Sequence, residues 1–474
     1  MRTHRLTSFL WALCASQLAL PSSLSVAKPR ERHALIFYTA QTQGTLEPCG
    51  CTSDPLGDFA RVTALVRKAA QTGAALLVDA GNLTYPPGEL APRKQESADL
   101  VAGFLARELN RLPFAGSALG ESDLAAGVSK LQPNRLAANL GDLPFVAPSP
   151  IKAVGGIKIG VFGLVDPALA SAQGWKVADP VLTAKAEADR LRAAGAEIVV
   201  ALAPLDRGQA RTVARQAAVD IVVLGKNVGE GMAQAEKVGD AFLVAPGSEM
   251  EHLGKLEIVL RERVVGKPRD LLLDAGGPTA NRLRLLEIER QLGQLDTDLD
   301  RWAKDAEADP AFVARKRKEY ADLKAEKARL SGVAWAAPAQ GSYFINELVP
   351  IRRTLPRDTA LAAGMRKLDQ AVGAANLRVA EAPPPAEAGR AHYSGDASCV
   401  HCHKASARFW KATAHAHAWK TLKTVGKTAH GDCVVCHVTG YGEVGGSSVG
   451  FNKGLQNVQC ESCHGPGSIH VEKR

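Results

Sequence analysis

A five-residue pattern, Cys-x-x-Cys-His, occurs three times in the last sixth of the chain, at residues 399–403, 433–437 and 460–464. Two thiols three residues apart lie on one helical turn and can reach the two vinyl groups of a single porphyrin, while the adjacent His is held under the iron. A redox dithiol or half of a zinc site would explain one copy, but three copies in one short segment favour three covalent haem c groups. The predicted thioether cysteines are Cys399, Cys402, Cys433, Cys436, Cys460 and Cys463, and the predicted proximal iron ligands are His403, His437 and His464.

The far-side iron ligands must come from other residues of the same segment, which holds nine of the twelve histidines of the chain. An iron with His on both faces is coordinatively full and suits electron transfer. We predict His415 and His470 as distal ligands, with His430 as the next candidate. A His on a short tether cannot easily pass around its own porphyrin, so each is expected to bind a haem anchored by a different motif. The histidines outside the motifs are His392, His401, His415, His417, His430 and His470.

The residues around the motifs closely resemble the cytochrome c-554 family of multihaem proteins. The resemblance covers roughly residues 392–471. It is carried by Tyr393-Ser394-Gly395, by Trp410 with Thr413-Ala414-His415, by Cys436-His437-Val438-Thr439-Gly440-Tyr441, and by Val458 to Gly467 followed by His470. It implies a compact, mostly helical electron-transfer module with closely stacked haems, and it places His415 in the family's Trp-x-x-x-x-His setting. Members often carry a fourth haem, so this is either a three-haem version or a fragment.

The first 27 residues are expected to be an export signal. Arg2 and Arg5 precede a mostly apolar run from Leu6 to Leu20, and Ser25-Val26-Ala27 suits a small-residue cleavage site. A lipoprotein signal at Cys14 is the weaker alternative, because Trp11-Ala12-Leu13 is a poor lipobox. No later stretch is apolar enough to span a bilayer. Since haem attachment also belongs outside the cytoplasm, we predict a periplasmic or otherwise extracytoplasmic protein.

The basic charge balance does not imply a nucleic-acid partner. Losing Arg2 and Arg5 with the signal lowers the formal charge from +9 to +7. Two propionates on each of three ferrous haems would remove about six more charges. No run of Lys and Arg interleaved with aromatic residues argues otherwise. The expected partners are redox proteins, such as other cytochromes or quinol-linked donors, and the oligomeric state is left open.

The sequence pattern of residues 28–275 predicts a layered α/β domain. Short apolar runs rich in β-branched residues predict strands, and amphipathic stretches such as 59–71 and 97–111 predict helices between several of them. The predicted strands are 34–39, 74–79, 146–154, 157–165, 197–202, 220–224 and 241–245.

This region resembles the 5′-nucleotidase type of calcineurin-like metallophosphoesterase. The frame from Phe37 to Gly44 looks like the first metal motif, Leu76 to Asn82 like the second, and Gly155 to Leu164 like a shared strand pair. Residues 220–228 and 245–248 continue the resemblance in order. The family holds two metal ions about 4 Å apart with Asp, His and Asn side chains.

The metal-ligand positions of that family are replaced here. A neutral amide is a weak ligand and Leu, Pro and Val are none, so two cations could not be held together against their repulsion. We therefore predict a domain without phosphoesterase activity, although Glu121 and Asp123 persist. The replacements are Gln41, Gln43, Asn82, Leu119, Gly120, Pro204, Lys226 and Val228.

Cys49-Gly50-Cys51 follows the first predicted strand, where the active site of that family opens. The sequence leaves three interpretations open: a strained local disulfide, a redox or metal-binding pair, or cysteines that only pack. We therefore keep Cys49 and Cys51 as a possible redox or metal pair.

The remaining segments connect the two domains. Leu285, Ile288, Leu292, Leu295 and Leu299 recur at helical spacing and, with the continuation after Asp309-Pro310, predict a helical hairpin over 279–332. Residues 333–380 predict a short strand and a helix, and residues 381–390 form a Pro/Ala linker. The predicted haem module spans residues 391–474.

Several functions fit this organisation. The favoured one is a periplasmic, three-haem electron carrier with an α/β domain that docks a partner or binds a nucleotide-like ligand without hydrolysing it. The alternative is a multihaem oxidoreductase of small nitrogen or sulfur compounds, which needs one five-coordinate iron beside an acid–base group. A metal-dependent phosphohydrolase is opposed by the missing ligands. Whether the protein is an enzyme is left open at this stage.

Overall fold

The structure, a computed structural model, describes residues 31–50, 54–131, 134–141, 143–261, 272–305, 309–331 and 336–473. The predicted export signal and Cys51 lie outside these residues. No helix within the described ranges is long and apolar enough to cross a membrane.

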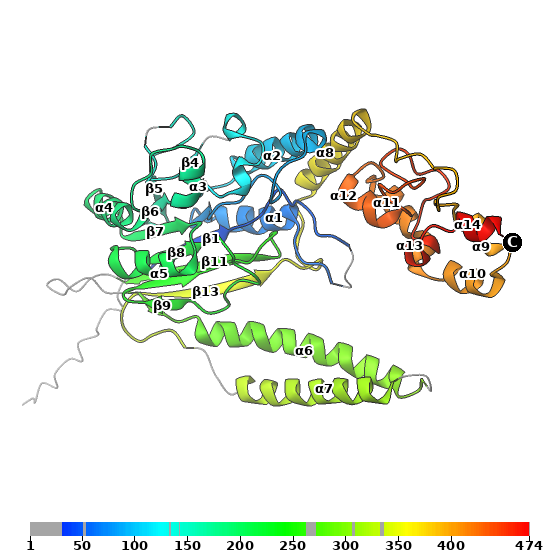
Figure 1. Ribbon diagram of the computed structural model, residues 1–474. Coiled ribbons are helices and arrows are strands. Elements are labelled where there is room, and N and C mark those ends of the chain that lie inside the picture. The colour runs from blue at the N-terminus through cyan, green and yellow to red at the C-terminus, as the bar shows by residue number, and fades with distance from the viewer. Residues whose placement is uncertain are drawn as a thin grey trace, which may run out of the picture.

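A seven-stranded mixed sheet forms one half of the α/β domain (Figure 1). Its order is β12-β13-β11-β1-β2-β3-β4. The parallel strands β1, β2 and β3 bring their carboxyl ends to one edge, while β11 and β13 run antiparallel beside β1. The strands are β1 (Glu31–Thr39), β2 (Ala75–Asp79), β3 (Phe114–Ala118), β4 (Arg135–Leu136), β11 (His252–Arg261), β12 (Leu273–Asp274) and β13 (Tyr343–Pro350).

A six-stranded sheet of order β5-β6-β7-β8-β10-β9 packs against the first. Its central strands are fully buried, which explains their continuous runs of Val, Ile and Ala. The prediction of one strand over 146–154 was wrong at its start, because the ladder covers only its last four residues. The strands are β5 (Ile151–Val154), β6 (Ile157–Gly163), β7 (Ile198–Ala203), β8 (Ile221–Leu224), β9 (Glu236–Val238) and β10 (Ala241–Val244).

Helices cover the outer faces of both sheets. Phe59, Phe104 and Met365 join the outer core of the first sheet, and Ala188 with Val213 cover the second. The result is a four-layer α/β/β/α sandwich. Its helices are α1 (Phe59–Ala70), α2 (Gln95–Leu109), α3 (Pro167–Ala172), α4 (Pro180–Ala193), α5 (Arg207–Gln216) and α8 (Thr359–Arg378), with short 3-10 turns η1 (Pro92–Lys94), η2 (Ser122–Leu124) and η3 (Val128–Lys130).

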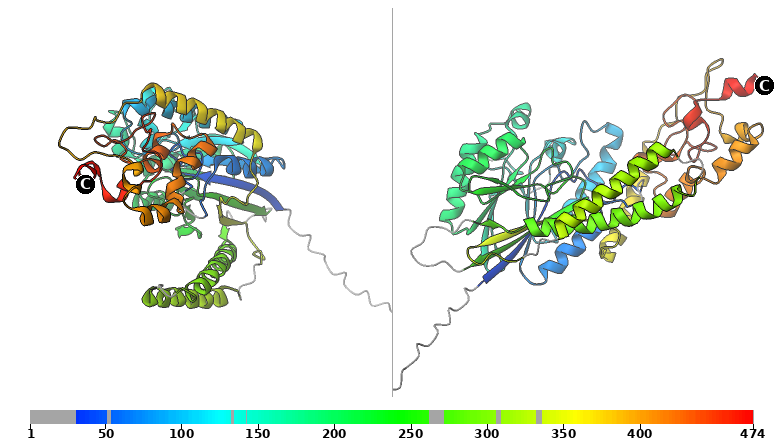
Figure 2. Two further views of the ribbon diagram at one scale, coloured as in Figure 1. Left: turned by 90° about the vertical axis from the view of Figure 1, so that its right-hand side faces the viewer. Right: turned by 90° about the horizontal axis from the view of Figure 1, so that it is seen from below.

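Two long helices, α6 (Gly277–Trp302) and α7 (Pro310–Ser331), form an antiparallel pair that stands apart from the sheets (Figures 1 and 2). Ile288, Leu295, Leu323 and Leu330 are buried between them. Asp309 accepts a hydrogen bond from the Ala311 amide at 2.9 Å and so caps the second helix.

The C-terminal module is a set of short helices around a small apolar core, located beside α8 (Figure 1). The predicted fold class, a layered α/β domain followed by a helical hairpin and a small, mostly α module, is confirmed. The helices are α9 (Asp396–Val400), α10 (Lys404–Lys411), η4 (Ala414–His417), α11 (Ala418–Val425), α12 (Gly431–His437), α13 (Glu461–His464) and α14 (Ser468–Glu472).

The module is docked on the α/β domain through the segment that leads into α12. The Lys427 Nζ lies 2.6 Å from a Glu47 carboxylate oxygen, in the loop after β1. The Asn376 side chain of α8 donates to the Ala429 carbonyl at 2.9 Å. The segment between α8 and α9 is also held, because the Gly445 amide donates to the Pro384 carbonyl at 2.7 Å.

Candidate functional site

Each Cys-x-x-Cys-His motif lies on or beside a short helix. Residues 433–437 lie within α12, residues 460–464 begin at the N-cap of α13, and residues 399–403 run from α9 to the N-cap of α10. The first cysteine of each motif is half-buried and the second is exposed, and all six thiols are free. Cysteines at this spacing lie on the same side of a helical turn, as attachment to one porphyrin requires.

Glu461, inside the third motif, holds the other parts of the module together. Its buried carboxylate accepts hydrogen bonds from the amides of Ser394 (3.0 Å) and Gly395 (2.7 Å), just before α9. It also accepts from the Gly467 amide at 2.7 Å, just before α14. One side chain therefore fixes the start of the first motif and the turn that leads to His470.

A second network joins the second and third motifs. The Thr439 hydroxyl, two residues after His437, donates to the Asn457 carbonyl at 2.9 Å and accepts from the Gln459 amide at 3.0 Å. The Gln459 side chain in turn accepts from the Asp396 amide of α9 at 2.7 Å. All three motifs are thus tied by buried polar groups rather than by a large apolar core.

The first and third motifs are close in space. The pKa of the Cys399 thiol is raised to about 11, first by burial and then by the neighbouring Cys460 thiol. The Trp410 indole of α10 donates to the Val458 carbonyl at 2.8 Å, and the Val458 amide reaches the His415 carbonyl at 3.2 Å. These contacts bring η4, which contains His415, beside the third motif.

His403 and His470 face each other with ring centroids 6.2 Å apart and planes inclined by 27°. This separation lies within the range of stacked ring pairs. Two metal–imidazole bonds of about 2.0 Å each, together with the radii of two rings, add up to about 6 Å. The same separation would also allow the two imidazoles to bind one metal ion from opposite sides.

The His437 ring is fixed by a backbone carbonyl. Its Nδ1 lies 2.6 Å from the Ala418 oxygen at the start of α11. A proximal ligand commonly donates one ring N–H to such an acceptor, which leaves the other nitrogen for the metal. The histidines of the first and second motifs, His403 and His437, therefore fit the role of ligands of a haem iron.

The other predicted ligands differ in their surroundings. His415 is exposed in η4, and His464 is exposed at the end of α13. The Nε2 of His430 lies 3.0 Å from the Asp369 carbonyl of α8, so this nitrogen faces the α/β domain. The structure thus brings His470 to a proximal ligand and directs His430 to the domain interface.

The positions that match metal ligands of phosphoesterases are occupied by internal hydrogen bonds. The Gln41 side-chain oxygen accepts from the Val228 amide at 3.0 Å, and the Asn82 amide group donates to the Gly225 carbonyl at 3.1 Å. The Lys226 Nζ lies 2.7 Å from Asp166. A Cβ on Gly120 would meet the Asn82 side chain at 2.5 Å, so the space for a ligand there is filled.

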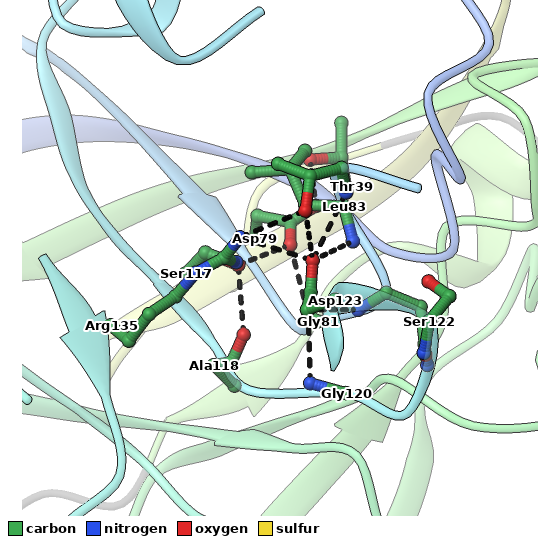
Figure 3. Close-up of polar contacts among 12 residues, drawn as sticks. Thr39, Asp79, Gly81, Leu83, Ser117, Ala118, Gly120, Ser122, Asp123 and Arg135 are labelled. Carbon is green, nitrogen blue, oxygen red and sulfur yellow. Dashed lines mark hydrogen bonds and ion pairs between the residues drawn. The ribbon is translucent and has the colours of Figure 1, made fainter. Parts of the chain in front are cut away.

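A buried ion pair lies beside these residues (Figure 3). The Arg135 and Asp123 side chains are 2% and 0% exposed, and the Arg135 Nη2 lies 3.0 Å from the Asp123 Oδ1. Asp123 also accepts from the backbone amides of Asn82, Leu83, Thr84 and Gly120 at 2.9–3.0 Å. The Arg135 guanidinium thus supplies the positive charge beside the buried Asp123 carboxylate. No group of three or more His, Cys, Asp or Glu that could hold a metal occurs in the described part of the chain.

Residues 398–465 match the family model described as cytochrome c554 and c-prime. Cytochrome c-554 of Nitrosomonas europaea is 43% identical over 93 residues, which cover 16% of this chain and 40% of that protein. The chain thus spans less than half the length of this curated relative. The resemblance inferred from the motifs is confirmed, and it indicates a c-type cytochrome module with covalently bound haem c.

The α/β domain is similar to solved phosphoesterases. The calcineurin-like phosphoesterase YfkN of Bacillus subtilis is 20% identical, with a TM-score of 0.40, over 50% of this chain and 88% of that chain. A 5′-nucleotidase precursor of Thermus thermophilus is 17% identical, with a TM-score of 0.48, over 72% of this chain and 59% of that chain. These are proteins of the class that the sequence motifs resemble.

The cytochrome c-554-like module contains functional residues that the sequence reasoning missed. Glu461 and Gln459 position the motifs, and neither was singled out. The one local signal was the charged residue Glu461 between the two cysteines of the third motif. Its role depends on loops 66 residues away, however, and the spacing does not indicate those contacts.

Cys49 is exposed with a free thiol, and its loop lies against the cytochrome c-554-like module through Glu47. The pKa of the Cys433 thiol is raised, mainly by burial and also by Asp432 and Cys49, while Lys427 lowers it. Cys51 lies outside the described residues, so the predicted redox or metal pair stays a prediction.

Asp79, at the end of β2, provides a pH-dependent contribution to the stability of the α/β domain. Burial raises its pKa to about 7, against hydrogen bonds from Ser117 and Thr39 that lower it. The unfolded-state pKa is about 3.9. The native state therefore holds a proton that the unfolded chain releases, and stability falls as the pH rises from about 4 to about 7.

We expect Asp79→Asn to flatten this dependence. The wild-type free energy of unfolding should fall by up to about 1.4 kcal/mol per pH unit more steeply than that of the variant. Urea denaturation of both proteins between about pH 4 and pH 7 measures the difference. Parallel pH profiles would mean that Asp79 is ionised in the native state.

Proposed function

We propose that this chain is an extracytoplasmic electron-transfer protein with three covalently attached haems and an α/β domain that does not hydrolyse phosphate esters. The observation that carries the proposal is the arrangement of the three motifs. Buried Glu461 and Gln459 join them, and the His403 and His470 rings lie 6.2 Å apart, close enough that both could bind one haem iron. The family match to residues 398–465 supports the haem chemistry.

The chain's own residues have three roles in this function. Haem c, when bound, supplies an iron that gains and loses one electron. The paired thiols would hold each porphyrin, and His403, His437 and His464 would serve as iron ligands. The Ala418 carbonyl fixes the His437 ring, and Glu461 fixes the turn before His470. Rigid ligands of this kind limit the rearrangement that accompanies a change of charge on the iron.

The α/β domain is proposed as a docking or ligand-binding scaffold. Gln41, Asn82 and Lys226 are engaged with protein groups, and Arg135 provides the charge that neutralises Asp123. The expected partners of the whole protein are redox proteins, such as other cytochromes or quinol-linked donors. The predicted export signal and the requirements of haem attachment support a periplasmic location.

The haem count is the first test. Exported protein should carry three haem masses that survive denaturation, because each motif supplies its own pair of thioether bonds. Replacing Cys399 and Cys402, Cys433 and Cys436, or Cys460 and Cys463 by Ala should each remove one haem mass. Intact-mass spectrometry and haem staining of denaturing gels measure this.

A wild-type protein with fewer than three haem masses would contradict the proposed count. The visible spectrum of the same sample separates the two redox functions. A fully low-spin spectrum agrees with an electron carrier. A high-spin fraction in wild type would instead favour the multihaem oxidoreductase.

The second test concerns phosphate-ester hydrolysis. Purified protein with added manganese, zinc or calcium should show no turnover of nucleotides above the metal-free rate, since the ligand positions hold amides, Lys and apolar residues. Glu121→Gln and Asp123→Asn serve as comparison variants. Metal-dependent turnover that is lost in either variant would show that a metal centre survives.

A further inference from the structure

The two ends of the cytochrome c-554-like module differ in what surrounds them. The second motif, on α12, faces the α/β domain, where Lys427, Ala429 and His430 contact Glu47, Asn376 and Asp369. The first motif lies at the opposite end, where α9, α10 and α14 point away from the sheets (Figure 1). The first motif therefore lies at an end of the module that another protein can approach.

Three cations follow the first motif directly. Lys404, Arg408 and Lys411 are exposed on α10, and His403 is the N-cap of that helix. At 100° per residue, positions 404, 408 and 411 lie within about 60° of one another around the helix. They form one cationic stripe that begins beside the proximal ligand of the first motif.

The stripe has no internal counter-charge among the described residues. No described carboxylate lies within ion-pair distance of Lys404, Arg408 or Lys411, although most cations of the α/β domain are paired. Like charges at spacings of three and four residues destabilise a helix by a few tenths of a kcal/mol each. The three exposed cations on one side of α10 would therefore attract an acidic surface.

An apolar side chain accompanies the stripe. Phe409, on the same helix, is 76% exposed, the most exposed large apolar side chain in the described part of the chain. Redox partners commonly meet through a small interface in which charges steer the encounter and a few apolar atoms exclude water. Both features occur here on one helix of eight residues, although Phe409 lies about 100° around the helix from Arg408 and farther from Lys404 and Lys411, so it borders the stripe and is not part of it.

We propose that the α10 stripe of Lys404, Arg408 and Lys411 is the docking site of an acidic redox protein, which exchanges electrons through the first motif. This inference rests on the proposed function. Each encounter would transfer one electron, so that the partner would be oxidised by one electron as the haem c held by the first motif is reduced, or the reverse. Because the α/β domain covers the other end of the module, electrons would enter and leave through this end.

The test compares two double charge reversals. Lys404→Glu with Lys411→Glu removes the stripe. Lys152→Glu with Lys237→Glu makes the same change of charge on β5 and β9, the exposed edge strands of the second sheet. Glu is about as good a helix former as Lys, so the exposed α10 positions should fold normally. A flavodoxin, a small acidic electron-transfer protein, serves as the probe.

We expect the stripe variant to bind flavodoxin at least about tenfold more weakly at low salt, and to lose most of the ionic-strength dependence of its reduction rate. The control variant should keep at least about half of the wild-type affinity. Calorimetric titration gives the affinity and stopped-flow reduction gives the rate. Equal losses in both variants would overturn the inference, because the effect would then be one of net charge.

Two further measurements on the same samples separate the possible failures. Haem mass shows whether three groups are attached, and a deficit in wild type would count against the proposed function itself. Potentiometric titration shows whether the cations instead pair with haem propionates. A shift of one reduction potential in the stripe variant with unchanged flavodoxin binding would overturn the docking site.

Discussion

Replacing Arg135 by Met is expected to lower the free energy of unfolding of the α/β domain by about 3–5 kcal/mol. The substitution removes one partner of a buried ion pair and leaves the Asp123 carboxylate without a counter-charge. Asp123 is 0% exposed, so water cannot solvate its carboxylate in place of the guanidinium. A loss of this size is a large part of the stability of a typical domain.

The effect should concentrate on the strand ends that the pair joins. Asp123 holds the turn after β2 through the amides of Asn82, Leu83 and Thr84, and Arg135 holds β3 through the Ser117 hydroxyl at 2.9 Å. Hydrogen exchange in β2 and β3 should therefore accelerate more than exchange in β7 and β8. Urea denaturation gives the overall change.

The matched control is Arg190→Met, which breaks an exposed pair with Glu187 on α4. An exposed pair contributes about 0–1 kcal/mol, so this variant should stay close to wild type. Arg135→Lys should lie between the two, because an ammonium keeps the charge but cannot reproduce three guanidinium hydrogen bonds. A loss below about 1 kcal/mol in Arg135→Met would show that Asp123 becomes protonated at little cost.

The sequence predicted the layers of the fold well because the buried strands carry an unmistakable pattern. β7, β8 and β10 are continuous apolar runs with no polar interruption, as expected for strands covered on both faces. The start of β5 was mispredicted because Val146 makes only an isolated parallel bridge with Arg135, and the ladder with β6 begins at Ile151. The strand order could not be predicted, since β1 pairs with β11 some 220 residues later and periodicity does not encode that partner.

In the candidate site, too, local features could be predicted from the sequence and contacts between distant segments could not. The predicted attachment cysteines and proximal histidines rest on local spacing alone, whereas the proximity of His403 and His470 depends on a turn held by Glu461. His430 stays a predicted candidate ligand, and its Nε2 lies against the Asp369 carbonyl of α8, a contact that its position in the sequence does not indicate. Contacts between modules are set by the folded surfaces, and the sequence of one module alone does not reveal them.

Replacing His470 by Ala is expected to leave haem content unchanged and to convert about one haem in three to a high-spin form that binds carbon monoxide. His470 faces His403 at 6.2 Å, so its loss would leave the iron above His403 with an open position. Added imidazole should restore the low-spin spectrum. His470→Met should keep the iron low-spin and raise its reduction potential, because thioether sulfur favours the ferrous state.

His417→Ala is the control, because His417 lies exposed in η4 with no assigned ligand role. Its spectrum and potentials should match wild type. Glu461→Ala should reproduce part of the His470→Ala spectrum, since the Gly467 amide then loses its acceptor and the turn before α14 is released. Glu461→Gln keeps one acceptor oxygen and should recover most of the low-spin signal. If His470→Ala and His470→Met both keep wild-type spectra and potentials, His470 is not an axial ligand. The 6.2 Å pairing with His403 would then be a packing contact, and His415 would become the first candidate to test by the same pair of substitutions.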